Sequence, residues 1–416
     1  MRQADSMRST CFLLLALLAV TPAAAATTSV ADCQKCHANQ NLAQLDNRGQ
    51  ALSLFVDPAK YAVSAHGGLE CAACHVDLAQ MTQLPHPANL RPVVCSSCHL
   101  AEGQEFAASS HAQLVSEANP PGMNCATCHG SHDILSPQNP KSPTSRSNLS
   151  ALCLTCHENE SDTISVQAEV KAYRKSVHGR RALTQGDALA AQCVDCHGSH
   201  KILPRDNPNS SINKPHIPET CGRCHAAVLA DYRGSIHGKA IAAGVMDAPV
   251  CTDCHGEHTI EMSQVSTSSV SAEHIPETCG RCHENVQLTE KYGMAAGRFS
   301  TYSDSYHGLA NQYGKTVAAN CASCHGYHHI LAPTDPASSV HPNHLAATCG
   351  KCHPNAGENF TKGKMHVQAT LENSPGVFFV RRFYYIFIGA LMVAFIAYII
   401  LEYTGFLKRR RHRRGA

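Results

Sequence analysis

One five-residue motif, Cys-x-x-Cys-His, occurs eleven times in this chain of 416 residues and uses 22 of its 23 cysteines. Two thiols at this spacing can each form a thioether with a vinyl group of haem, and the adjacent histidine can then bind the iron. Zinc ribbons and disulfides are the alternatives, but zinc sites do not require a histidine directly after the second cysteine. The repeated motif therefore predicts eleven covalently attached c-type haems.

The predicted attachment residues are the two cysteines and the histidine of each motif. The first cysteines are Cys33, Cys71, Cys95, Cys125, Cys153, Cys193, Cys221, Cys251, Cys279, Cys321 and Cys349. The second cysteines are Cys36, Cys74, Cys98, Cys128, Cys156, Cys196, Cys224, Cys254, Cys282, Cys324 and Cys352. The histidines that follow, the predicted proximal ligands, are His37, His75, His99, His129, His157, His197, His225, His255, His283, His325 and His353.

The motifs alternate between two types, which indicates duplication of a two-haem module. Type 1 motifs begin at Cys33, Cys95, Cys153, Cys221, Cys279 and Cys349, and a Ser-x-His sequence follows most of them. Type 2 motifs begin at Cys71, Cys125, Cys193, Cys251 and Cys321, and Gly-x-His usually follows directly. Helix-forming segments such as 166–177 and 226–236 precede the Ser-x-His sequences, whereas period-two strand patterns are scarce.

The glycine after the Ser-x-His histidine suits a left-handed residue at a helix C-terminus. We therefore expect short helices that end near an iron ligand, at Gly67, Gly179, Gly238 and Gly308. The predicted fold class is a mostly irregular array of two-haem modules with short α-helices, plus one C-terminal transmembrane helix. With 6 % aromatic residues and no Trp, the chain has a thin apolar core of its own, so porphyrin faces would replace it.

The number of histidines outside the motifs decides whether every iron has a second ligand. The Ser-x-His class, with His366 placed at a similar position after the last motif, offers six distal ligands for the type 1 haems. The Gly-x-His class, with His86 after the Cys71 motif, offers five for the type 2 haems. A Gly-x-His histidine lies three residues from its own proximal histidine, so it must reach a neighbouring haem. The predicted distal ligands are His66, His86, His111, His132, His178, His200, His237, His258, His307, His328 and His366.

The two ends of the chain have different targeting signals. Residues 1–26 have a basic start, a short apolar run and small residues, as in a secretory signal peptide. Phe383–Leu401 is uncharged and long enough to cross a bilayer, and six basic residues follow it from Lys408 onward. We expect a haem domain at 27–370 in the periplasm, a single anchor at 377–407 in the bacterial inner membrane and a cytoplasmic tail at 408–416.

The chain resembles multihaem c-type cytochromes with doubled Cys-x-x-Cys-His motifs, relatives of class III tetrahaem cytochromes and periplasmic penta- and decahaem carriers. The resemblance covers residues 31–366 and implies electron transfer between a quinol-oxidising membrane subunit, such as a cytochrome b, and periplasmic or extracellular acceptors. Bis-histidine ligation implies low potentials suited to anaerobic respiration.

Two other function classes remain open. A multihaem reductase acting on nitrite, hydroxylamine or a sulfur oxyanion would keep one iron five-coordinate, which the complete count of distal histidines disfavours. A structural role for the haems is the other. The formal net charge of +2 arises largely from the basic tail, and nothing in the sequence indicates nucleic-acid binding. His366 lies close before the predicted anchor, so the last haem is expected near the membrane and the Cys33 haem at the far end.

Overall fold

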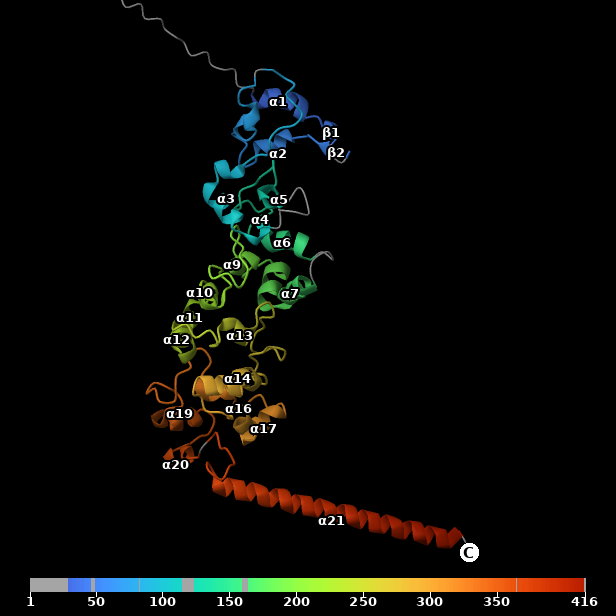
Figure 1. Cartoon of the computed structure of the whole chain (residues 1–416), viewed down its shortest axis with the longest axis vertical. Helices are drawn as coiled ribbons and strands as arrows, with labels where there is room; N and C mark the ends of the chain where they lie inside the picture. The colour runs from blue at the N-terminus through green and yellow to red at the C-terminus, as the bar shows by residue number, and fades with distance from the viewer. Residues whose placement is uncertain are drawn as a thin grey trace, which may run out of the picture. The chain divides into compact units, whose positions relative to one another are not determined.

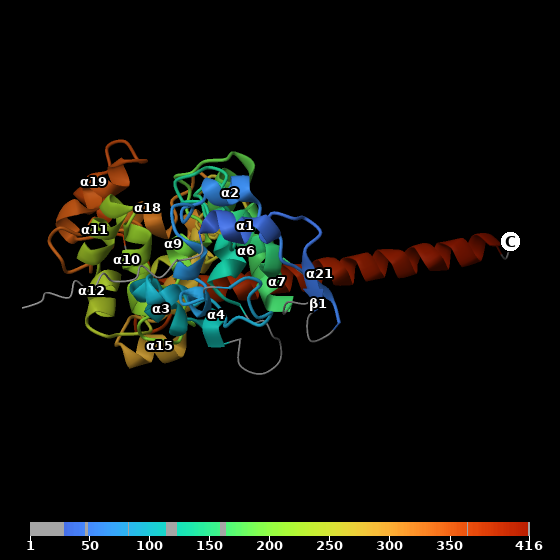
Figure 2. The same ribbon diagram turned by 90° about the horizontal axis from the view of Figure 1, so that it is seen from above.

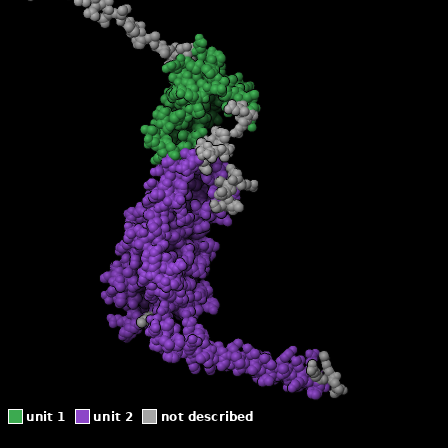
Figure 3. Space-filling model, viewed as in Figure 1, with its two compact units in different colours: residues 1–107, 115–145 green, residues 108–114, 146–416 purple. Residues whose placement is uncertain are grey.

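The computed structural model describes residues 29–45, 49–81, 83–113, 123–158, 164–363 and 365–414. The predicted signal peptide lies outside these residues. Short helices joined by irregular segments make up most of the described chain, as the sequence predicts (Figure 1). The chain divides into two compact units, residues 1–107 with 115–145 and residues 108–114 with 146–416 (Figure 3).

Unit 1 contains short helices and a two-stranded antiparallel hairpin. In the hairpin, Ala43 lies opposite Ser53 and Leu45 opposite Ala51. The elements of unit 1, where η denotes a 3-10 turn, are α1 (Val30–His37), β1 (Ala43–Leu45), β2 (Ala51–Ser53), α2 (Pro58–Ala62), η1 (Cys71–Ala73), η2 (Val76–Leu78), η3 (Cys95–Ser97), α3 (Leu100–Ala107) and α5 (Cys125–His129).

Unit 2 is helical throughout its described elements, and η4 is a π-helical turn. Its elements are α4 (Ser110–Gln113), α6 (Leu149–His157), α7 (Ile164–Lys175), α8 (Val177–Gly179), η4 (Arg180–Thr184), α9 (Cys193–His197), η5 (Lys214–His216), α10 (Ile217–Gly222), α11 (Ala226–Gly234), α12 (Ile236–Ala242), α13 (Cys251–His255), α14 (Ile275–His283), α15 (Val286–Lys291), α16 (Arg298–Ser303), α17 (Tyr306–Gln312), α18 (Cys321–His325), η6 (Pro342–His344), α19 (Leu345–Gly350), α20 (Glu358–Thr361) and α21 (Pro375–Arg414).

Buried apolar side chains are few among the described residues. Eight hydrophobic residues are buried, and four of them form a small cluster around α10 and α12: Ile217, Ile241, Ala248 and Val250. Many of the fully buried side chains are instead serines, such as Ser109, Ser176 and Ser235. A polypeptide with so little buried apolar surface gains too little free energy from its own side chains to offset the conformational entropy lost on folding.

The C-terminal helix α21 is long and apolar. Within residues 375–410, the most apolar stretch of 18 residues has a mean hydropathy of 2.4, and none of it is buried. Its C-terminal part extends away from the other elements of unit 2 (Figures 1 and 2). By length and composition this helix could be a membrane anchor.

Candidate functional site: paired histidines beside the cysteine motifs

Four of the five type 2 motifs fold in the same way. Each forms a helical turn that begins at the first cysteine and ends at the histidine, as in α13. The glycine that follows has a positive φ of 76–82° at Gly130, Gly198, Gly256 and Gly326. A residue without Cβ adopts this conformation readily, and the chain leaves the turn at once. The histidine of Gly-x-His therefore moves away from its own motif.

The Ser-x-His sequences fold differently from the prediction. The serine caps the N-terminus of a new helix: the Ser235 hydroxyl accepts a hydrogen bond from the amide of Gly238 at 3.0 Å, and Ser176 and Ser305 cap in the same way. The histidine thus lies at the start of a helix, and the expected left-handed C-terminal glycine is wrong. A Cβ on Gly238 would lie 2.1 Å from the Tyr232 carbonyl oxygen, so this glycine permits close packing of two helices.

A tyrosine three residues before the serine is a positioning residue that the sequence analysis missed. The Tyr232 hydroxyl donates to the carbonyl of Pro249 at 2.9 Å, two residues before the type 2 motif at Cys251. Tyr61, Tyr173 and Tyr302 make the equivalent bond to Leu69, Ala191 and Ala319. The recurring Tyr-x-x-Ser-x-His-Gly pattern was the signal for it in the sequence. Each tyrosine joins a helix that presents one histidine to the attachment segment of another motif.

Backbone hydrogen bonds join the two histidine classes. The residue between serine and histidine donates its amide to an isoleucine carbonyl two residues after a Gly-x-His histidine. Within unit 2 the pairs are Ser110 to Ile202, Val177 to Ile260 and Ile236 to Ile330, each at 2.8 Å, and within unit 1 Ala65 donates to Ile134 at 2.7 Å. In these four repeats the bonds hold the two kinds of predicted distal histidine in a fixed relation.

The predicted proximal and distal histidines lie in pairs whose ring centres are 5.8–6.4 Å apart. Within unit 1 the pairs are His37–His86, His66–His99 and His75–His132. Within unit 2 they are His111–His157, His178–His225, His197–His258, His237–His283, His255–His328, His307–His353 and His325–His366. His129 is the remaining predicted proximal ligand, and His200 is the remaining predicted distal ligand.

The spacing of these rings fits a metal ion between them. A first-row metal binds an imidazole nitrogen at about 2 Å, and each nitrogen lies about 1 Å from its ring centre, so two axial ligands have centres roughly 6 Å apart. Rings in direct stacking contact would be closer. Another pair at this distance, His341–His344, is three residues apart on one turn, and both rings make hydrogen bonds within the loop.

The pairing follows one rule for each class. A Ser-x-His histidine pairs with the next type 1 motif, as His237 does with His283. A Gly-x-His histidine pairs with the preceding type 2 motif, as His258 does with His197. The exceptions are His86, which lies beside the type 1 histidine His37, and His366, which lies beside the type 2 histidine His325. The sequence analysis assigned His86 to a type 2 haem and His366 to a type 1 haem, and both assignments are wrong: His86 lies at a type 1 motif and His366 at a type 2 motif.

Several paired rings have a partner for the nitrogen that would point away from a metal. Nδ1 of His37 lies 2.8 Å from the Leu54 carbonyl, and Nδ1 of His366 lies 3.0 Å from the Thr301 hydroxyl. Such bonds orient a ligating imidazole and leave Nε2 for the metal. Burial lowers the pKa of His237 to about 4, with a further contribution from His283, so the ring is neutral, as a metal ligand must be.

The thiols of consecutive motifs are neighbours. Burial and the nearby Cys33 thiol raise the pKa of Cys71 to about 11, and burial with Cys221 raises that of Cys196 to about 11. The neighbours within unit 1 are Cys33–Cys71, Cys74–Cys95 and Cys95–Cys125, and within unit 2 Cys153–Cys193, Cys196–Cys221, Cys221–Cys251, Cys254–Cys279, Cys279–Cys321 and Cys324–Cys349. Within each unit the attachment points therefore follow one another in chain order.

The thiol contacts alternate with the period of the two-haem module. A type 1 motif meets the next type 2 motif through the first cysteine of each, as at Cys221 and Cys251. The type 2 motif then meets the following type 1 motif through its second cysteine, as at Cys254 and Cys279. Arg281 reinforces this second contact by donating to the Asp253 carbonyl at 2.8 Å. Two alternating geometries between successive attachment points follow from this arrangement.

The described motif side chains are not grouped as the ligands of a zinc ion would be. Among the described residues, no group of three or more His, Cys, Asp or Glu side chains has the arrangement of a metal site. A structural zinc ion needs four such ligands around it, whereas these histidines meet in twos and no described thiol joins them in a larger group. This arrangement suits a porphyrin, which supplies four ligands of its own and takes two from the protein.

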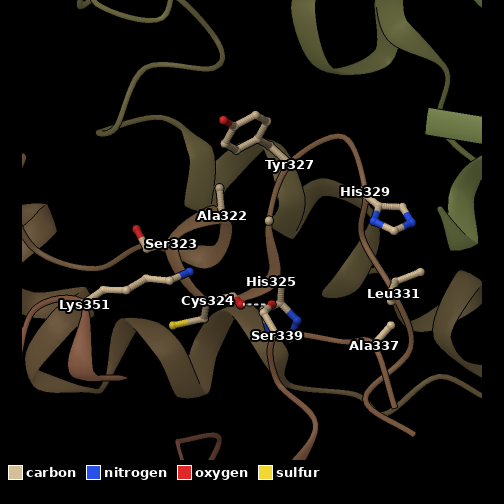
Figure 4. A pocket seen from close by; sticks show the side chains of 11 residues that line it. Ala322, Ser323, Cys324, His325, Tyr327, His329, Leu331, Ala337, Ser339 and Lys351 are labelled. Atoms are coloured by element: carbon tan, nitrogen blue, oxygen red, sulfur yellow. Dashed lines mark hydrogen bonds between the residues drawn. The ribbon is translucent and has the colours of Figure 1, made fainter. Parts of the chain in front are cut away.

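A cavity of about 420 Å³ adjoins the motif at Cys321 (Figure 4). Cys324, His325 and Lys351 line it, and the Ser339 hydroxyl donates to the Cys324 carbonyl at 2.5 Å at its edge. The lining offers a thiol, an imidazole and an ammonium group together with apolar atoms. These groups fit an apolar macrocycle that has carboxylate substituents and is attached through sulfur.

A relative among curated proteins is the "Multiheme cytochrome MtrA" of Shewanella baltica (strain OS185). It is 27% identical over 175 residues, which are 39% of this chain and 44% of the relative. The chain thus matches less than half the length of this relative. No protein-family profile matches the chain, and no solved structure does. The similarity supports a multihaem c-type cytochrome and, in general terms, electron transfer.

Proposed function

We propose that the chain is a membrane-anchored electron carrier with eleven covalently bound c-type haems. The paired histidines are the observation on which the proposal rests. Ten described pairs have ring centres 5.8–6.4 Å apart, the distance expected for two ligands of one metal ion, and each pair contains one motif histidine. All eleven motif histidines would be proximal ligands, and the eleven predicted distal histidines would be the second ligands. Bound haem iron supplies one-electron redox chemistry, and the protein supplies ligation, orientation and electrostatic tuning.

Electrons would pass between neighbouring haems in chain order within each unit, because consecutive motifs have adjoining thiols. Ten of the eleven motif histidines lie beside a second histidine ring that could bind the other face of the iron. A carrier is therefore favoured over a reductase, which keeps one iron open for its substrate. The array would exchange electrons with a quinol-oxidising membrane subunit, such as a cytochrome b, at the end near α21. Periplasmic or extracellular acceptors would be served at the other end.

The segment before α21 supports this choice of ends. His366 lies beside His325, and the Asp304 carboxylate binds Arg381 of α21 at 3.0 Å. Asp304 is three residues from His307, which lies beside His353. The last two haems in the sequence would therefore both have a ligand close to the N-terminal end of α21 around Arg381, here called the base of α21. With α21 in the inner membrane, these haems would be the first or last to exchange electrons there.

Two measurements on the full-length protein, from cells able to attach c-type haem, test the proposal. The intact mass should equal that of the processed chain plus eleven haems. Electron paramagnetic resonance of the oxidised protein should give low-spin ferric signals alone. A mass without haem refutes the cofactor assignment. A high-spin ferric signal from one haem in each molecule instead supports the reductase.

A further inference from the structure

Helix α17 starts two residues after Asp304, which binds Arg381 of α21, and differs from its copies in earlier repeats. Helix α17 begins after Ser305, as α12 begins after Ser235 and α8 after Ser176. The fourth residue after the serine is Arg180 in the Ser176 copy and Lys239 in the Ser235 copy, but Leu309 in α17. The eighth is Thr184, then Ala243, but Tyr313 at the end of α17.

These two replacements give α17 an exposed apolar stripe. Leu309 and Tyr313 are four residues apart and so lie on one face of the helix, with Tyr306 one turn earlier. Leu309 is 45 % exposed and Tyr313 82 %. Lys315, next to the stripe, is also exposed. The earlier copies have Arg180 and Lys239 where α17 has Leu309, as expected for a helix that faces water.

The contact between Asp304 and Arg381 places this stripe at the base of α21. Arg381 also donates to the Tyr385 hydroxyl at 2.9 Å, and Arg382 lies over the ring of Phe378. Aromatic and basic residues at the end of an apolar helix are typical of the membrane–water interface. Tyr313 is nine residues beyond Asp304, so at the helical spacing the stripe begins beside this contact and ends within roughly 14 Å of it.

We propose that Tyr306, Leu309 and Tyr313 of α17 form a lipid-binding face that rests on the bilayer in which α21 is anchored. Tyrosine suits this position because its ring enters the apolar boundary while its hydroxyl stays hydrated. Lys315 would attract anionic headgroups. The inference rests on the anchoring of α21 in the proposed function. A lipid contact at α17 would hold the haem ligated by His307 at a fixed height above the membrane.

Site-specific photo-crosslinking tests this inference on the full-length haem protein. Benzoylphenylalanine is placed at position 313, at position 243 as the matched site in the preceding repeat, and at position 395 within α21. Each protein is irradiated in nanodiscs of phosphatidylcholine and phosphatidylglycerol, and adducts are identified by mass spectrometry. We expect lipid adducts at positions 313 and 395, and several-fold fewer at position 243.

The three positions separate the possible failures. Adducts at 395 with none at 313 overturn the lipid-binding face and leave the membrane anchor intact. Crosslinks from 313 to a protein chain overturn it in favour of a protein interface, and equal lipid labelling at 243 and 313 shows that the stripe has no special role. Absence of lipid adducts at 395 refutes the anchor itself, and the lipid-binding face with it.

Discussion

The Glu169 carboxylate accepts a hydrogen bond from Nδ1 of His258, 2.5 Å away, and His258 lies beside His197 in one of the histidine pairs. Other paired rings with a described Nδ1 partner use neutral oxygens, such as the Leu54 carbonyl for His37 and the Pro87 carbonyl for His86. A carboxylate draws the Nδ1 proton more strongly than a carbonyl does and makes the imidazole a stronger donor to a metal. The Cys193 haem should therefore have a lower potential than haems with neutral partners.

Glu169→Gln should raise the potential of that one haem. The variant keeps an oxygen acceptor and removes the negative charge. The free-energy difference between the ferric and ferrous states should then change by about 1 kcal/mol, which is about 40 mV for a one-electron couple. Spectroelectrochemical titration should show one of the eleven haem equivalents shifted upward. Glu158→Gln is the control, because Glu158 binds Arg174. An unchanged titration curve for Glu169→Gln contradicts the tuning role.

Removing one distal histidine should open one particular iron. His366→Ala should give a high-spin ferric signal from the haem at Cys321, since His366 lies beside His325. His86→Ala should do the same at the Cys33 haem. Electron paramagnetic resonance measures both. His344→Ala, which removes a ring bonded to the Pro336 carbonyl, should leave all irons low-spin. A fully low-spin His366→Ala protein shows that this histidine is not a ligand.

The sequence predicts the local elements here better than it predicts their partners. Short helices, scarce strands and the apolar helix at the C-terminus all follow from motifs and hydropathy. The partners of His86 and His366 do not, because position after a motif says nothing about which ring a folded chain brings near. Pairing depends on contacts between segments far apart in the chain, such as the bond from Ile236 to the Ile330 carbonyl.

The role of the Ser-x-His glycine shows another limit of the sequence. Gly238 fits a helix end by composition alone, since glycine is common there. In the structure it lies inside α12, because Ser235 starts a new helix and the space beside Gly238 is filled by the Tyr232 carbonyl. The same Ser-x-His-Gly sequence can either start a helix at its serine or end one at its glycine. Only the packing against the neighbouring helix α11 distinguishes the two.

Tyr232→Phe should destabilise the protein while leaving its ring packing in place. The variant loses the hydrogen bond to Pro249, a cost of about 1 kcal/mol in the free energy of unfolding. The equivalent position in the Ser109 repeat is naturally Phe106, so the fold tolerates the ring without the hydroxyl. Thermal unfolding followed by haem absorbance measures the change. Tyr327→Phe, at a side chain that is 75 % exposed, should have little effect, and equal melting of both variants contradicts the role of the bond.

Gly238→Ala should move His237 away from His283. The added methyl group would lie 2.1 Å from the Tyr232 carbonyl oxygen, a backbone atom that cannot turn aside, so α11 and α12 must separate. Overpacking of this kind costs about 1–3 kcal/mol, and the histidine one residue before the glycine moves with the helix. We expect a lower melting temperature together with a high-spin signal from the Cys279 haem.

Gly350→Ala is the matched control, because a Cβ there meets no atom within 4 Å. A Gly238→Ala protein that melts like the Gly350→Ala protein and stays low-spin would show that the close approach of the two helices does not fix the ligand.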